Sequence, residues 1–153
     1  MAVYIAVVGA SAASDDQVRV AHVVGSELAQ AGAIVITGGG AGVMAAASQG
    51  AREAGGRVVG ILPGEDRTAA NPWVEIALTT GLGELRNGLI VRSADAVIAI
   101  GGAYGTLSEI ALALAAGRSV IGLDTWAIEG IEAAVSPQAA VARALALARR
   151  SDT

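Results

Sequence analysis

The sequence predicts a single α/β domain of the Rossmann-like class, with a parallel sheet covered by helices on both faces. Short apolar runs with β-branched residues, each too brief for a helix, alternate with longer segments of helical periodicity. Nearly all of these runs are apolar throughout, as expected for strands buried on both faces. Glycine-rich turns follow several of them, at the strand ends where open α/β sheets bind ligands. We expect one domain over residues 1–150 and a disordered tail over residues 151–153.

The start of the chain predicts a strand, a loop and a helix. Residues 3–8 form a continuous apolar run, and the small residues 9–14 that follow are typical of a loop facing a ligand. Asp15 or Asp16 is expected to cap the next helix, and Gly32 is expected to end it. The apolar stripe of this helix consists of Val20, Val24 and Leu28.

The middle of the chain repeats the alternation. A glycine-rich turn at residues 37–42 leads into a predicted helix of small residues over 43–54. The longest irregular segment, residues 63–72, contains Arg67 and fits a lid, a ligand clamp or a solvated surface loop. Trp73 fits a loop anchor or a subunit contact. Strands are expected over residues 33–36, 57–62 and 74–78.

Residues 83–93 predict a helix that turns Leu85, Leu89 and Ile90 inward. Arg86 lies at its start. On the helical pattern alone, Arg86 fits a solvated position on an amphipathic helix.

Three further elements complete the predicted fold. Residues 96–100 form a buried strand, and residues 119–123 are expected to form the last strand. Pro137 marks the first residue of a C-terminal helix that runs to residue 150. Trp126, just after the last predicted strand, fits a cover over a ligand ring or a dimer contact.

Composition excludes several kinds of chemistry. The chain has no cysteine, which removes disulfides, thiolate metal sites and cysteine nucleophiles, and which fits a reducing cytoplasm. It also has no lysine, so a Schiff base to pyridoxal phosphate and a Walker-type phosphate lysine are both excluded. His22 is the only histidine, and we expect it to be a packed or surface residue, with no metal site in the protein.

Charge and hydropathy limit the classes of partner that we expect for this protein. A net charge of −4 argues against non-specific nucleic-acid binding as the main task, and charged residues interrupt every apolar run before it reaches the ~20 residues of a membrane helix. No basic region precedes the first apolar run, so we expect a strand there, not a signal peptide. We expect a cytoplasmic protein without a nucleic-acid or membrane partner. The mean hydropathy of +0.59 is high for such a chain and predicts a homo-oligomer, either a dimer or a tetramer.

The stretch with the clearest chemistry joins the strand at 96–100 to the next helix. Gly101 and Gly102 end the strand, and Gly105 lies where the helix begins. Free backbone N–H groups and the positive end of the helix dipole point into such a turn, and the missing side chains let a phosphate oxygen approach. Thr106 adds a hydroxyl donor. Glu109 would repel a phosphate, so we expect it to face another part of the ligand.

Two more small-residue turns follow the first and second predicted strands. Gly9 and Ser11 belong to the first turn, and Gly39 and Gly40 to the second. Strand ends of this kind gather at one edge of a parallel sheet, so all three turns should line a single crevice. The dinucleotide pattern G-x-G-x-x-G is missing after the first strand. These turns predict a site for a phosphorylated, nucleotide-like small molecule.

The same segments resemble a known family. Residues 101–109, G-G-A-Y-G-T-L-S-E, are similar to the P-G-G-x-G-T-x-x-E motif of the LOG family, formerly mislabelled as lysine decarboxylases, and of the related molybdenum-cofactor carrier proteins of the SLOG superfamily. The likeness extends to residues 37–44, 60–64 and 84–87, so it spans most of the chain in the right order.

The resemblance implies two functions. A carrier would hold the molybdenum cofactor unchanged. A LOG-type phosphoribohydrolase would cleave the N-glycosidic bond of a nucleoside 5′-monophosphate, and the family then implies that Arg86 lies opposite Glu109 as the catalytic pair. Glu109 would stabilise the oxocarbenium ion or position water, while Arg86 orients the substrate. The motif proline is Gly101 here, its second glycine is Ala103, and Asn87 replaces a basic residue; these departures favour binding. A structural or regulatory oligomer with a vestigial site is a third alternative.

Overall fold

The computed structural model describes residues 1–150, and the tail predicted at 151–153 lies outside the described residues. Its centre is a seven-stranded sheet in the order β4-β3-β2-β1-β5-β6-β7, in which every neighbouring pair is parallel. The predicted parallel α/β fold is therefore confirmed. The strands are β1 Tyr4–Gly9, β2 Ile34–Thr37, β3 Arg57–Leu62, β4 Ile76–Thr79, β5 Ala96–Ile100, β6 Ser119–Leu123 and β7 Ile131–Ala133.

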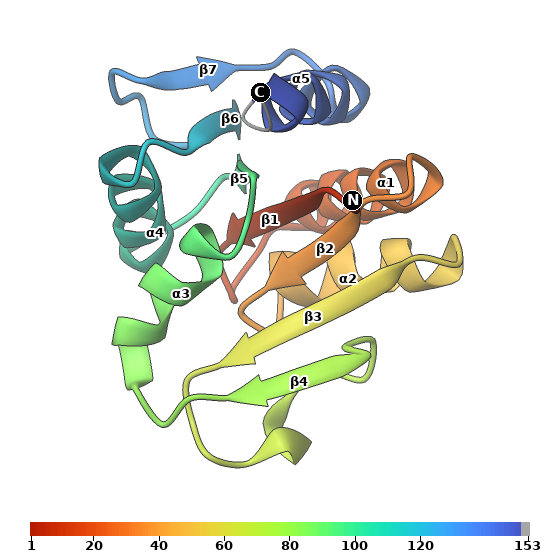
Figure 1. The fold of residues 1–153 in the computed structure, drawn as a ribbon, viewed down its shortest axis with the longest axis vertical. Helices are drawn as coiled ribbons and strands as arrows, with labels where there is room; N and C mark the ends of the chain where they lie inside the picture. Colours follow the sequence, from red (N-terminus) through yellow and green to blue (C-terminus); the bar gives the residue numbers. More distant parts are fainter. Residues whose placement is uncertain (151–153) are drawn as a thin grey trace.

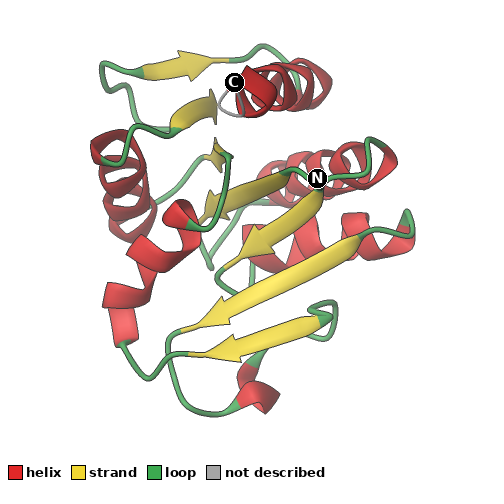
Figure 2. Ribbon diagram, viewed as in Figure 1, coloured by secondary structure: helices red, strands yellow, loops and turns green. Residues whose placement is uncertain are grey.

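Helices cover both faces of the sheet (Figures 1 and 2). Helices α1, α2 and α5 pack with Ile5 and Val7 of β1, while α3 and α4 pack with Ala6 and Val8 of the same strand. This alternation follows from the period of two in a β-strand, which sends successive side chains to opposite faces. The helices are α1 Asp15–Gln30, α2 Val43–Glu53, α3 Asn87–Arg92, α4 Tyr104–Ala115 and α5 Pro137–Arg150, with short 3₁₀ helices η1 Arg67–Ala69 and η2 Gly83–Arg86.

Helices α1 and α2 approach each other closely through two glycines. A side chain at Gly25 would collide with the carbonyl oxygen of Ala47, and one at Gly50 would collide with that of His22. The contact is therefore backbone against backbone. His22 lies at its edge and binds Glu53 of α2 at 2.8 Å, which is a structural role.

The first helix begins one or two residues earlier than predicted. Ser14, not Asp15 or Asp16, is the N-cap: its hydroxyl accepts a hydrogen bond from the amide of Gln17, and the Gln17 side chain accepts one from the amide of Ser14. This reciprocal arrangement is a capping box. At the other end, Gly32 follows the helix with φ of +79°, as predicted.

The helix predicted over residues 83–93 is wrong in part. The segment begins as the 3₁₀ helix η2 and becomes α-helical only at Asn87, which rotates the expected apolar stripe. Ile90 is fully buried, but Leu85 is 78% exposed and Leu89 is 41% exposed.

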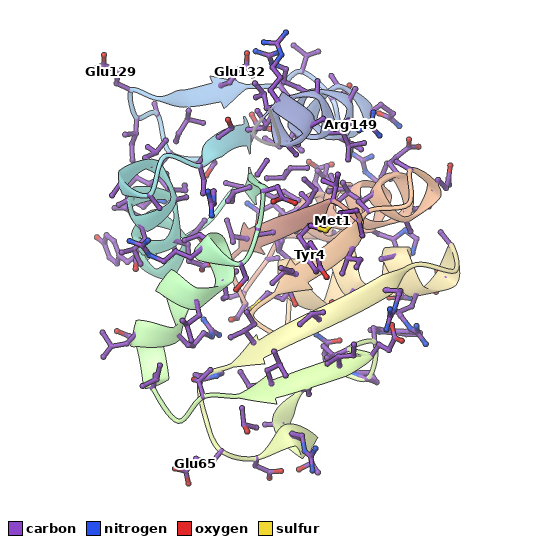
Figure 3. The ribbon with its side chains drawn as sticks, viewed as in Figure 1. Met1, Tyr4, Glu65, Glu129, Glu132 and Arg149 are labelled. Atoms are coloured by element: carbon purple, nitrogen blue, oxygen red, sulfur yellow. The ribbon has the colours of Figure 1, made fainter. Side chains whose placement is uncertain are left out.

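A further difference lies at the C-terminal side of the sheet. Residues 119–123 are not the last strand, because β7 pairs with β6 beyond them. Figure 3 shows Glu132 in β7 and Glu129 just before it at this edge, with Glu65 at the opposite end of the molecule.

The sheet reverses its direction of winding between β1 and β5. Strands β2, β3 and β4 follow on one side of β1, and β5, β6 and β7 on the other. In open α/β sheets a crevice forms outside the carboxyl ends of the strands at such a point. Across residues 1–150, none of the helices has the length and apolarity that a membrane span requires.

Candidate functional site

The turn between β5 and α4 leaves a row of backbone donors without acceptors. Gly101 and Gly102 leave the strand with φ of +52° and +118°, and Ala103 then caps α4 in an extended conformation without any side-chain capping bond. Within residues 1–150 the amides of residues 102–106 have no hydrogen-bond acceptor. Together with the helix dipole, these amides make the start of α4 suited to an anion.

A cavity of about 520 Å³ opens beside this turn. Its walls come from the loop after β1, from η2 and the start of α3, and from the first turns of α4, with Met44 and Pro63 completing it. Six of the predicted site residues lie together in this wall, namely Gly9, Ser11, Arg86, Gly105, Thr106 and Glu109.

The remaining predicted glycines do not line this cavity. Gly39, with φ of +75°, packs under the side chain of Leu62, and Gly40 lies under Met44. Gly101 and Gly102 line a neighbouring hollow of about 330 Å³ instead. The second glycine-rich turn therefore supports the wall of the cavity from behind.

Gly102 and Gly105 differ in what surrounds them. A side chain at Gly102 would collide with Thr106, so this glycine lets the buried Thr106 pack against the turn. A Cβ at Gly105 would meet no atom within 4 Å. Gly105 thus leaves open space in the cavity wall.

Arg86 is held at the junction of η2 and α3. Its guanidinium donates one hydrogen bond to the side-chain oxygen of Asn87 and another to the carbonyl of Gly38, at 3.3 Å. Its Nε is buried without a partner. Burial lowers the pKa of Arg86, and the carboxylate of Glu109 opposes that effect.

Glu109 lies one turn into α4 and is only 8% exposed. Burial raises its pKa from the ordinary 4.5 to about 7, although the charge of Arg86 acts in the opposite direction. Within the described chain, no ion pair or hydrogen bond to the Glu109 carboxylate is found. The pair implied by the resemblance is therefore an electrostatic coupling across one cavity, without direct contact.

Asn87 has a role that the sequence did not indicate. It is 4% exposed, lines the cavity and accepts a hydrogen bond from Arg86. The family resemblance leads us to expect a basic residue at position 87, after Arg86. This chain has Asn87 there, and its side chain orients Arg86. Residues 1–150 contain no group of three or more His, Asp or Glu side chains that could hold a metal ion.

The model of the SLOG cluster4 family matches residues 2–149. The chain belongs to this family.

Solved structures similar to this SLOG cluster4 chain include two proteins described by their ligand. The molybdenum cofactor binding protein of Rippkaea orientalis is 35% identical with a TM-score of 0.88, covering 100% of this chain and 99% of that one. The Moco carrier protein of Chlamydomonas reinhardtii is 32% identical with a TM-score of 0.89, covering 98% and 99%. The similarity extends over whole chains in both cases.

One relative of this SLOG cluster4 chain is an enzyme. The cytokinin riboside 5′-monophosphate phosphoribohydrolase LOG of Oryza sativa subsp. japonica is 34% identical over 90 residues. These residues make up 56% of this chain and 37% of the rice protein.

Proposed function

We propose that this protein binds a phosphorylated, nucleotide-like small molecule, and that the molybdenum cofactor is its first candidate ligand. The observation that carries the proposal is the row of amides over residues 102–106 without acceptors, next to a cavity that Arg86 also lines. A phosphate needs such donors, and a helix start supplies them together with a positive dipole end. The two similar structures are named for binding or carrying this cofactor.

Three features favour binding of an unchanged ligand over hydrolysis of its glycosidic bond. Gly101 has φ of +52°, which proline cannot adopt, so the turn differs from the family motif in its backbone as well as in its side chain. Ala103 adds a methyl group to the cavity wall. Asn87 contacts Arg86 and brings no second positive charge. Hydrolysis requires the reacting groups in fixed positions, and a displacement of about 1 Å can cost on the order of a hundredfold in rate. Anion binding by the amides and the dipole at the start of α4 depends less on such fixed positions.

A second candidate is a nucleoside 5′-monophosphate phosphoribohydrolase. It is favoured by Glu109, whose pKa of about 7 suits proton transfer at neutral pH, and by Arg86 in the wall of the same cavity. Glu109 would then act on water or on the developing oxocarbenium ion, and Arg86 would hold the substrate.

One experiment separates the two candidates. The purified protein is incubated with adenosine monophosphate, free adenine is measured, and the ligand that co-purifies is identified by mass spectrometry. A carrier yields no appreciable adenine and retains a phosphorylated ligand. Turnover that disappears in both Arg86→Ala and Glu109→Ala, but persists in the remote control Glu129→Ala, would establish the hydrolase instead.

The amount of ligand that co-purifies with variants of the site also distinguishes the two candidate functions. We expect substitution of Gly105 or Thr106 to weaken retention more than Glu109→Ala does, because the first two residues lie at the start of α4 where the anion would bind. The opposite order would place the main contact on the carboxylate.

We also propose that the protein forms a homo-oligomer. Several leucines on and around η2, α3 and α4 are exposed, although side chains of this size are usually buried. They are Leu82, Leu85, Leu89 and Leu112, between 38% and 78% exposed. A second copy packed on this surface would cover them. Cytoplasmic location remains a prediction that rests on the lack of cysteine.

A further inference from the structure

The segment that follows β6 reaches back over the turn between β5 and α4. Thr125 donates a hydrogen bond from its hydroxyl to the carbonyl of Gly101 at 2.6 Å. Trp126 donates one from its indole N–H to the carbonyl of Ala103 at 3.2 Å. Two neighbouring side chains thus hold two carbonyls of the same short turn.

The position of these two side chains is itself well defined. Asp124 turns the chain at the end of β6 with φ of +48°, and no other residue apart from glycine has a positive φ within residues 1–150. A side chain at Gly122 would come within 2.7 Å of the Thr125 methyl, so this glycine makes room for Thr125. The ring of Tyr104 stacks on Trp126, with centroids 6.0 Å apart.

The two hydrogen bonds fix the direction of the peptide groups that they hold. The C=O of one residue and the N–H of the next point in opposite directions across a trans peptide, and no described peptide bond is cis. A Gly101 carbonyl directed at Thr125 therefore directs the Gly102 amide away from it. In the same way, the carbonyl of Ala103 and the amide of Tyr104 point to opposite sides.

This turn needs such restraint more than most. Gly101 and Gly102 both have φ values that only glycine adopts readily, and a glycine pair can exchange one peptide orientation for another at little cost. A flipped peptide would present a carbonyl oxygen to the anion in place of an N–H group. The proline of the family motif, with its fixed φ, is absent here.

We infer that Thr125 and Trp126 are positioning residues for the anion site, which hold the Gly101 and Ala103 carbonyls away from it and keep the turn amides directed at the ligand. The inference rests on the proposed function, since it assigns these residues to the same phosphate site. They act through the backbone carbonyls of the turn, to which they donate their hydrogen bonds.

The test uses inorganic phosphate as the probe and ¹⁵N-labelled full-length protein. Phosphate affinity is measured from amide chemical shifts in the parent, in Thr125→Val and in Trp126→Phe. Thr125→Val removes the hydroxyl and keeps the branched shape over Gly122, while Trp126→Phe removes the indole N–H and keeps a ring against Tyr104. Each variant loses one hydrogen bond, so we expect Kd to rise about threefold to tenfold.

Matched controls identify the cause. Thr125→Ser keeps the hydroxyl and is expected to bind phosphate as the parent does. Trp73→Phe makes the same chemical change outside the turn and is also expected to leave Kd unchanged. In ligand-free Thr125→Val, the Gly102 amide resonance should move or broaden, which a general loss of stability would not produce selectively.

The outcomes separate the inference from the proposed function. If the parent fails to bind phosphate, the proposed function fails and the inference falls with it. If the parent binds phosphate and both variants bind equally well, with an unchanged Gly102 resonance, only the inference is overturned. Melting curves of each variant confirm that the protein compared is folded, and Trp126→Phe gives an independent reading if Thr125→Val is unstable.

Discussion

Arg86 and Glu109 line one cavity and affect each other's pKa, yet they form no ion pair within residues 1–150. Burial therefore has a larger effect on the pKa of the Glu109 carboxylate than the charge of Arg86 has. An ion pair would have kept Glu109 ionised at neutral pH. With a pKa of about 7, the carboxyl group is instead only partly ionised there and can both accept and release a proton.

The first prediction concerns stability and pH. The pKa of Glu109 is raised in the folded state, so between pH 4.5 and 7 the folded protein holds a proton that the unfolded chain releases. Ionising the buried Glu109 destabilises the folded state. This destabilisation is absent below pH 4.5 and complete above pH 7, where it is on the order of 3 kcal/mol. Glu109→Gln should thus raise the free energy of unfolding by about 2 kcal/mol at pH 8 and leave it nearly unchanged at pH 4. Urea denaturation at both pH values measures this, with the exposed Glu129→Gln as control.

The second prediction concerns anion binding and pH. Sulfate stays doubly charged between pH 6 and 8, so any change in its affinity reports on the protein. An ionised Glu109 repels sulfate at the start of α4, and we expect Kd to be on the order of tenfold lower at pH 6 than at pH 8. Calorimetric titration should show this in the parent and a flat profile in Glu109→Gln. A parent profile without any pH dependence would mean that the carboxylate lies too far from the anion to matter.

The third prediction uses the open space at Gly105. Gly105→Ala meets no atom within 4 Å, and removing a glycine from a helix start should hold or raise stability by about 0.5 kcal/mol. The methyl group enters the cavity, so we expect sulfate Kd to rise on the order of tenfold, equivalent to ~1.4 kcal/mol. Gly64→Ala is the matched control, because it also meets no atom within 4 Å and does not line the cavity. Equal affinities in the two variants would exclude the start of α4 as the anion site.

The fourth prediction restores the motif proline. Gly101→Pro cannot adopt the φ of +52°, loses the hydrogen bond from the Gly101 amide to the carbonyl of Leu123, and collides with the side chain of Gln17. We expect a loss of on the order of 3 kcal/mol in the free energy of unfolding. Gly101→Ala keeps the amide and should lose less. A fully stable Gly101→Pro would show that the turn readily takes another conformation.

The fifth prediction addresses assembly. Light scattering of the parent should give the mass of a dimer or tetramer, and Leu85→Glu should reduce it because a charge would be buried in the contact. Val135→Glu, at a position 98% exposed away from α3 and α4, should leave the mass unchanged. A monomeric parent at micromolar concentration would contradict the proposal.

The fold could be predicted because its signals are local. Apolar runs such as β5 are too short for a helix and rich in β-branched residues, which indicates buried strands, and the glycine turns mark their carboxyl ends. Strand β7 was missed because Ile131–Ala133 is three residues long, with two of the three exposed, so it carries no apolar run. Leu85 and Leu89 were placed wrongly because a change from 3₁₀ to α-helical geometry alters the angle between side chains, and the sequence pattern does not show it.

Individual residues of the candidate site could be predicted from the sequence, but the hydrogen bonds between them could not. Arg86, Gly105 and Glu109 lie in the cavity wall as expected from their motifs. The contacts of Thr125 and Trp126 with the turn join residues more than twenty positions apart, and no local pattern reports such contacts. Asn87 was identified only as a departure from a motif, because its hydrogen bond to Arg86 depends on a rotamer.

The backbone contact of α1 with α2 restricts how this protein can change over evolutionary time. Neither Gly25 nor Gly50 can gain a side chain without pushing the two helices apart, so we expect relatives of every ligand preference to keep small residues at both positions. The cavity wall comes mainly from segments outside this contact, namely the loop after β1, η2, the start of α3 and the first turns of α4. New ligand preferences should therefore arise through substitutions in those segments, while the two glycine positions of the α1–α2 contact stay nearly constant.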